Sequence, residues 1–149
     1  MSGEPLFAAM FDCSRNAVMK LETVKTFARI LKSFGYNALL LYTEDTYEIE
    51  GEPYFGYMRG RYTKEELKEL DHYCSDLGIE LIPCIQTLAH LNQLFRWPTY
   101  NDIHENKDIL LPEEEKTYAL IEKMFQTCRK CFHSKRIHIG MDEADVGRG

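Results

Sequence analysis

Two adjacent carboxylates, Asp142 and Glu143, stand at the end of a short apolar run, 137–141, near the C-terminal end of the sequence. Carboxylates serve proteins as general acids and bases and as ligands of divalent cations. Successive side chains of a strand point to opposite faces, so two neighbouring acids that serve one site must contact different parts of the ligand. The pair therefore predicts a site in which the two carboxylates have different tasks.

Polar side chains also follow the three earlier apolar runs of the sequence. In chain order these residues are Asp12 and Arg15, then Glu44 and Asp45, then Gln86 and His90. Parallel α/β folds bind their ligands at the carboxyl ends of strands, in barrels and in open sheets alike. Because the N-terminal ends of the runs carry nothing comparable, we expect a ligand site where the strands end.

Each of these residues also has a structural interpretation, which stays open from the sequence. Asp12 is suited to turn a loop, and Glu44 and Asp45 are suited to a solvated loop. A lone histidine such as His90 is more often a hydrogen-bonded structural residue than a catalytic one. Single positions therefore predict little, and the prediction depends on the clustering.

A divalent cation is a further interpretation of the acid pair. The residues that could bind it are Asp142, Glu143, His90 and His138. No HxH or HExxH spacing occurs in the sequence, which weakens this interpretation. We expect no metal and no cofactor.

The elements that would position these residues alternate between strands and helices. Apolar spacing predicts strand 6–11, helix 21–34, strand 38–42, helix 64–77, strand 80–85, helix 112–131 and strand 137–141. Thr63 and Glu66 form a capping box before the second helix, and Gly35 and Gly78 follow the first two helices. The strands are continuously apolar, which is typical of a parallel sheet with right-handed crossovers. Pro83 is awkward for a central strand.

Composition excludes several classes of partner. The chain of 149 residues is long enough for one domain, and its net charge of -6 argues against nucleic acid. No apolar run is long enough to span a bilayer, and the first residues lack the pattern of a signal peptide. The odd count of five cysteines indicates reduced thiols in a cytoplasmic protein. We expect the lone pair Cys128 and Cys131 to lie on a helix surface rather than to bind zinc.

The segment HIGMDE, 138–143, resembles the H-x-G-x-D-E motif of glycoside hydrolase family 20, the β-N-acetylhexosaminidases. Three earlier segments resemble the first three strand segments of that family in the same order, namely MFDCSR, LLLYTEDTYEI and PCIQTLAH. The resemblance covers nearly the whole chain, which makes it more specific than any single motif.

The resemblance implies a (β/α)8 barrel and substrate-assisted catalysis, an exception to the scheme with two enzyme carboxylates. By resemblance, Glu143 is the general acid and later the base, and Asp142 binds the nitrogen of the substrate's 2-acetamido group. The acetamido oxygen is then the nucleophile. The substrate would be a glycan with terminal β-linked GlcNAc or GalNAc.

The resemblance also implies roles for the residues around the acid pair. Arg15 would bind sugar hydroxyls, and His138 would support the site from behind. His90 and Asp45 would form a hydrogen-bonded relay behind the acid, with Glu44 as the less favoured partner of His90.

The sequence departs from the family in two respects. Gln86 and Thr87 replace an acidic stretch that many relatives carry before Pro-Gly-His. A complete barrel needs around 250 residues, and this chain supplies about four βα units. The expected fold is therefore α/β, a parallel βαβαβαβ half of a TIM barrel, with residues 1–149 as one partial catalytic domain.

A half-barrel would expose two strand edges and its interior face. We therefore expect either a homo-oligomer or association with the remainder of the barrel in a longer protein, and weak hydrolysis or none by the chain alone. The alternatives are a non-catalytic module that binds sugar or is purely structural, and a metal-dependent hydrolase.

Overall fold

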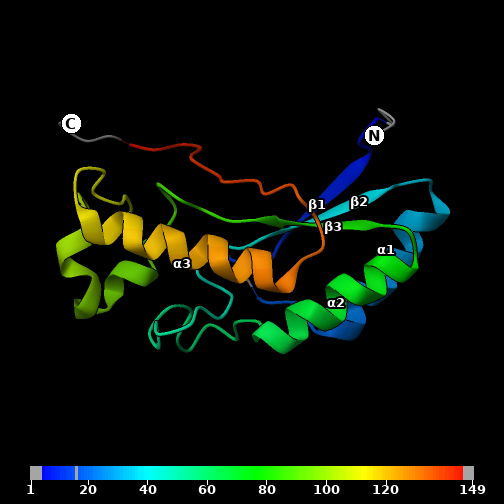
Figure 1. The fold of residues 1–149 in the computed structure, drawn as a ribbon, viewed down its shortest axis with the longest axis horizontal. Coiled ribbons are helices and arrows are strands. Elements are labelled where there is room, and N and C mark those ends of the chain that lie inside the picture. The colour runs from blue at the N-terminus through cyan, green and yellow to red at the C-terminus, as the bar shows by residue number, and fades with distance from the viewer. Residues whose placement is uncertain (1–4, 16, 146–149) are drawn as a thin grey trace.

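A computed structural model describes residues 5–15 and 17–145 of the chain. It contains three parallel strands, β1 (Ala8–Asp12), β2 (Ala38–Tyr42) and β3 (Glu80–Cys84), in the order β1-β2-β3 (Figure 1). The parallel sheet predicted from the apolar runs is confirmed. Because Asp12, Tyr42 and Cys84 pair in register, the three strands end together and the polar residues that follow them meet.

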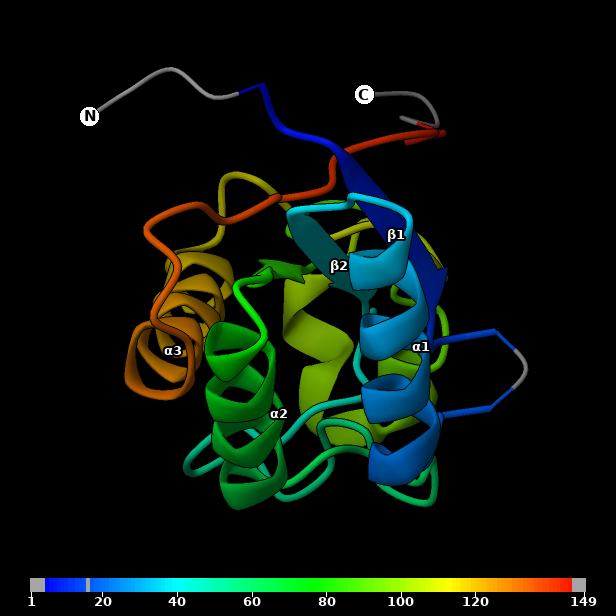
Figure 2. The ribbon, with the colours of Figure 1, turned by 90° about the vertical axis from the view of Figure 1, so that its right-hand side faces the viewer.

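Three helices cover one face of the sheet: α1 (Leu21–Ser33), α2 (Lys64–Asp76) and α3 (Glu115–Cys131). They lie side by side, and α2 packs against both α1 and α3 (Figure 2). The connection after β3, between the predicted strand 80–85 and the predicted helix 112–131, contains two short 3-10 helices, η1 (Leu94–Arg96) and η2 (Pro98–Ile103). No helix among the described residues has the length and apolar character needed to cross a membrane.

Local sequence signals explain where two of the helices begin and end. Thr63 accepts a hydrogen bond from the Glu66 backbone while the Glu66 side chain accepts one from the Thr63 backbone, which confirms the capping box. Gly35 and Gly78 follow α1 and α2 with φ of +84° and +70°, as the helix ends require. The prediction that Pro112 opens α3 is wrong, because Glu114 is extended and its side chain caps the Lys116 backbone.

The two faces of the sheet have different environments. Phe11 packs edge to face on Phe27 of α1, so this row of side chains points toward the helices. The alternate row, Met10, Leu40 and Ile82, points to the face that the helices do not cover. Met10 is 48% exposed. In a complete barrel this second face would be the interior.

The fourth predicted strand, 137–141, is wrong in extent. Only His138 pairs, through an isolated parallel bridge to Cys84. The His138 N–H donates to Pro83 O at 2.9 Å, and its carbonyl accepts from Ile85 N at 2.9 Å. Pro83 has no N–H with which to extend the ladder. On the other side of the bridge, Gly140 turns the chain away with φ of +75°.

All five cysteines are free and buried. The prediction that Cys128 and Cys131 lie on a helix surface is wrong, since each is 3% exposed and belongs to the hydrophobic core. Both therefore serve the packing of α3 in the core.

Candidate active site

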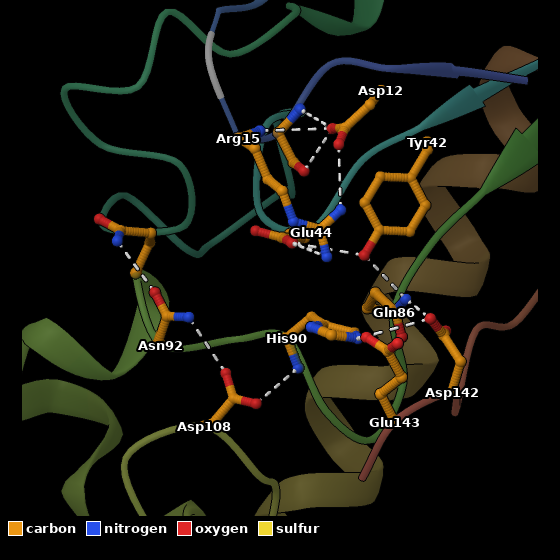
Figure 3. Close-up of polar contacts among 12 residues, drawn as sticks. Asp12, Arg15, Tyr42, Glu44, Gln86, His90, Asn92, Asp108, Asp142 and Glu143 are labelled. Atoms are coloured by element: carbon orange, nitrogen blue, oxygen red, sulfur yellow. Dashed lines mark hydrogen bonds and ion pairs between the residues drawn. The ribbon is translucent and has the colours of Figure 1, made fainter.

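The polar residues predicted as a site come together where the strands end (Figure 3). Segment 137–145 lies along β3, as its three backbone hydrogen bonds to residues 83–87 require. This arrangement brings Asp142 and Glu143 to the side chains that follow β2 and β3. The clustering expected from the sequence is confirmed for the strand ends, although individual partners differ.

Asp142 is held by a buried amide. Gln86, which is fully buried, donates from Nε2 to Asp142 Oδ1 at 2.7 Å and to the Tyr42 hydroxyl at 3.0 Å. Gln86 Oε1 accepts from the Met141 N–H at 3.1 Å. The hydrogen bond from Gln86 lowers the pKa of Asp142 below its ordinary value, so this carboxylate is ionised at neutral pH.

His90 lies against both members of the acid pair. Its Nε2 is 3.4 Å from Asp142 Oδ2 and 3.5 Å from Glu143 Oε2. The Glu143 side chain is 79% exposed, so it can exchange a proton with a bound ligand or with water. His90 adopts φ of +58° and donates its backbone N–H to Asp108, whose carboxylate also binds Asn92. Asp108 therefore helps to set the backbone that presents the imidazole.

Arg15 lies over the second strand from the end of the first. Its Nη1 is 3.0 Å from Asp12 Oδ2, and its Nη2 is 3.9 Å from Glu44 Oε1. The guanidinium stands 5.4 Å above the Tyr42 ring and its side chain is 55% exposed. Asp12 also accepts from Ser14 N and Oγ, so it turns the loop and orients Arg15 at the same time.

The relay predicted between Asp45 and His90 is absent. Asp45 is 1% exposed, its Oδ1 lies 3.2 Å from Arg59, and neither of its carboxylate oxygens has a hydrogen-bond partner among the described residues. Glu44 lies beside Arg15 and Arg59 and accepts from the Tyr42 hydroxyl at 3.3 Å. Burial raises the pKa of both acids. The structure therefore assigns Asp45 a buried ion pair.

His138 lies at the edge of the site. Its Nδ1 accepts a hydrogen bond at 3.2 Å from the N–H of Gly140, which precedes Asp142 by two residues. His138 is exposed, and this contact supports the turn that carries the acid pair. Its predicted role as a residue that supports the site stays a prediction.

The structure reduces the four-residue cation site to three residues. Ligand atoms of His90, Asp142 and Glu143 lie within 4.8 Å of one another, and they are the one such group in the described part of the chain. Two carboxylates and an imidazole are donors that a divalent cation accepts. The same three groups are equally suited to moving protons.

Sequence analysis missed two residues that complete the site. Tyr42 was counted with the apolar strand, although a Tyr at the last position of a strand can bring its hydroxyl to the site. Arg59 lies in the long loop after β2 and donates to Ser14 O at 2.7 Å while it pairs with Asp45. No local signal distinguishes Arg59 from its neighbour Arg61.

A cavity of about 520 Å³ lies elsewhere, beside the N-terminal end of β3. Four of its polar side chains pair with one another, Arg136 with Glu80 and His133 with Asp71. We therefore assign the site to the carboxyl ends of the strands, where polar groups face solvent, and not to this cavity.

Comparison with known proteins gives consistent matches. The family model described as glycosyl hydrolase family 20, catalytic domain, matches residues 8–148. Hexosaminidase D from Homo sapiens is 26% identical over 133 residues, which are 87% of this chain and 27% of the human protein.

Solved structures match the fold. A crystal structure of a β-N-acetylhexosaminidase has a TM-score of 0.83 and 23% identity, over 94% of this chain and 36% of that chain. A mutant Streptomyces plicatus β-hexosaminidase in complex with its product GlcNAc has a TM-score of 0.82 and 22% identity, over 93% and 33%. This chain spans about a third of the length of each. The likeness confirms a parallel α/β fold that corresponds to part of a TIM barrel.

Proposed function

This chain belongs to glycosyl hydrolase family 20, and from that membership we propose that it carries the acid pair of a β-N-acetylhexosaminidase. Such an enzyme releases terminal β-linked GlcNAc or GalNAc from a glycan. The observation that carries the proposal is the position of Asp142 and Glu143 at the carboxyl ends of parallel strands, both within 3.5 Å of His90. The Streptomyces plicatus relative, which holds GlcNAc as its product, supports the class of substrate.

Glu143 is the proton donor in this proposal. Its exposed carboxyl group protonates the glycosidic oxygen as the bond to the anomeric carbon breaks. In the second half of the reaction the carboxylate takes a proton from the attacking water. His90, beside Glu143, stabilises the charge that the carboxylate acquires between the two steps.

Asp142 acts on the substrate's own nucleophile. Its ionised carboxylate accepts a hydrogen bond from the acetamido N–H, and the acetamido oxygen attacks the anomeric carbon as the leaving oxygen departs. Positive charge then develops on the resulting oxazolinium ring, where a nearby carboxylate stabilises it. Water opens this ring with a second inversion, so the product retains the configuration of the substrate.

Arg15 binds the sugar in this proposal. Its Nη2 is 3.9 Å from Glu44, too long for a hydrogen bond, so this group can donate to a sugar hydroxyl. Its contact with Asp12 fixes the direction of the guanidinium. Arg15→Lys would lose the planar geometry and is expected to weaken binding.

We propose that residues 1–149 form about the first four βα units of the catalytic domain. A second copy or the rest of a barrel then covers Met10 on the open face and Ile139 and Met141 beside it, which are 42–50% exposed. The chain alone is expected to show weak hydrolysis or none. A single monomeric species in sedimentation, with rapid turnover of a fluorogenic N-acetylglucosaminide, would contradict both expectations.

We also propose a cytoplasmic location. The support is that all five cysteines are free and buried although the chain has enough of them for two disulfides. Fractionation of the native host, with detection by an antibody to the chain, tests it.

The two acid roles are separated by variants measured on different substrates. Glu143→Gln should lower turnover of substrates with poor leaving groups by about a hundredfold or more and spare activated aryl glycosides. Asp142→Asn should slow 2-acetamido substrates, whatever their leaving group. Equal losses for the two variants on all substrates would contradict the assignment of roles.

A non-catalytic sugar-binding module is the second candidate function. It is favoured by the exposure of Arg15 and Asp142, whose side chains are 55% and 52% accessible to a ligand. Calorimetric titration with GlcNAc would then show binding that depends on both residues, while no hydrolysis is detected in the presence of any barrel partner.

A further inference from the structure

The amide of Gln86 has one possible orientation in the structure. The Met141 N–H can only donate, so it must meet Oε1, and the ionised Asp142 can only accept, so it must meet Nε2. Gln86 is fully buried, and its amide contacts these two partners and Tyr42. The three hydrogen bonds therefore fix both the amide and the carboxylate that it holds.

Gly140 fits against the same amide. A Cβ at this position would lie 2.2 Å from Gln86 Oε1, 2.6 Å from Gln86 Cδ and 2.7 Å from Ile85 O. The backbone at Gly140 also has φ of +75°, a conformation that other residues rarely adopt. The turn before Asp142 and the Gln86 side chain therefore occupy complementary positions.

We propose that Gln86 is the positioning residue for Asp142. It binds Oδ1 and leaves Oδ2, 3.4 Å from His90 Nε2, to accept the acetamido N–H of the proposed substrate. The inference rests on the proposed function, since it specifies how the Asp142 carboxylate is oriented. Gln86 itself does not touch the substrate.

The same amide connects the acid to the two earlier strand ends. Gln86 donates to the Tyr42 hydroxyl, which donates to Glu44, and Glu44 lies beside Arg15. A shift of Gln86 would therefore move Asp142 relative to Arg15, the group proposed to bind sugar hydroxyls. The distance between these two groups sets whether one sugar ring can contact both.

A neutral amide suits this position better than an acid. A buried carboxylate at residue 86 would stand beside Asp142, and two like charges at hydrogen-bond distance cannot both ionise at neutral pH. Glutamine supplies two N–H donors without a charge, so it keeps Asp142 ionised.

Thr87 provides a matched control. Its Oγ1 donates to Ile139 O at 2.9 Å, so it also holds segment 137–145 but does not touch Asp142. Thr87→Val removes this bond with little change in volume. If Gln86 only held segment 137–145 against β3, its substitution would have the same effect as Thr87→Val.

The test compares Gln86→Leu with Thr87→Val in the full chain, assembled with its barrel partner where it has one. With a 2-acetamido substrate, kcat/KM of Gln86→Leu should fall about ten- to hundredfold, the loss of one hydrogen bond to a charged group. The acid limb of the pH profile should move to higher pH, while Thr87→Val changes neither. In the Asp142→Asn background, Gln86→Leu should have an effect of about threefold or less, because the two residues act together. Equal effects of the two variants, or additive effects with Asp142→Asn, would overturn the proposal.

Two further measurements keep the proposal testable if Gln86→Leu folds poorly or if the wild type has no turnover. Gln86→Glu preserves the volume, and its activity relative to the wild type should rise as the pH falls and the new acid becomes protonated. The Asp142 carboxyl resonance, followed by ¹³C NMR, should titrate at higher pH in Gln86→Leu than in the wild type or in Thr87→Val. An unchanged titration would refute the positioning role, whereas absent turnover by the chain assembled with the rest of its barrel would refute the proposed function.

Discussion

Gly140→Ala adds a single methyl group and is expected to disturb the site strongly. The new methyl group would lie 2.2 Å from Gln86 Oε1 and 2.7 Å from the Ile85 carbonyl oxygen, so the amide or the segment must move. The left-handed backbone costs an alanine about 1–2 kcal/mol. Loss of the hydrogen bond that Gln86 donates to Asp142 and of the one that it accepts from the Met141 N–H adds about 2–4 kcal/mol. The native arrangement around residue 140 should therefore be destabilised by about 3–6 kcal/mol in free energy.

Gly35→Ala is the matched control. Gly35 has φ of +84°, and a Cβ there meets nothing within 4 Å. In urea unfolding, Gly35→Ala should lower the free energy of unfolding by about 1–2 kcal/mol, which is the cost of the left-handed backbone alone. The difference between the two variants isolates the steric conflict with Gln86.

Urea unfolding alone would underestimate the effect of Gly140→Ala, because segment 137–145 can detach without unfolding the core. Hydrogen exchange resolves this, since the N–H groups of Ile85 and Thr87 donate to His138 O and Ile139 O. These two amides should exchange at least about a hundredfold faster in Gly140→Ala, and at the wild-type rate in Gly35→Ala once global stability is corrected. Wild-type protection of both amides in Gly140→Ala would refute the reasoning.

Three other outcomes are expected. Arg59→Met leaves the buried Asp45 without its cation, which should cost about 3–5 kcal/mol at pH 7. Burial raises the pKa of Asp45 above its ordinary value of 3.8, so the folded state binds this proton more tightly than the unfolded state does. The free energy of unfolding therefore falls as the pH rises from about 4. Urea titrations at several pH values should show a steeper fall in Arg59→Met than in the wild type. Thr63→Ala removes the cap of α2 and should cost about 1 kcal/mol, whereas Thr63→Ser, which keeps the acceptor, should not. Protein dialysed against EDTA should keep its sugar affinity, and a stoichiometric metal in elemental analysis would favour the cation interpretation of His90, Asp142 and Glu143.

The sequence was most informative where local chemistry decides structure. The strand predicted over 38–42 is present with the same bounds, because its side chains are apolar and β2 is largely buried on both faces. The Thr63 capping box was also predictable, since both partners lie within one turn of helix. The polar residues after each strand predicted the site for a related reason, because parallel strands in register must end together.

Features that depend on distant contacts were not predictable. Asp45 pairs with Arg59 and not with His90, a choice made by how the loop after β2 folds back over Ser14. The fourth strand is reduced to one bridge because Pro83 lacks a donor and Met141, which is not glycine, adopts φ of +75°. The sequence does signal the lost donor, since Pro83 is awkward for a central strand, but nothing in the sequence signals the positive φ of Met141.

The buried cysteines can report when the elements around them open. Burial raises the pKa of Cys74, Cys84 and Cys128 to about 12, so thiolate at pH 8 is rare, roughly one molecule in ten thousand. A thiol reagent can therefore modify these residues only when the element that holds them opens. Because they sit in α2, β3 and α3, mass spectrometry of the modified sites would reveal the sequence in which the layers separate. The same measurement with a barrel partner present would locate, element by element, the part of the sheet that association protects.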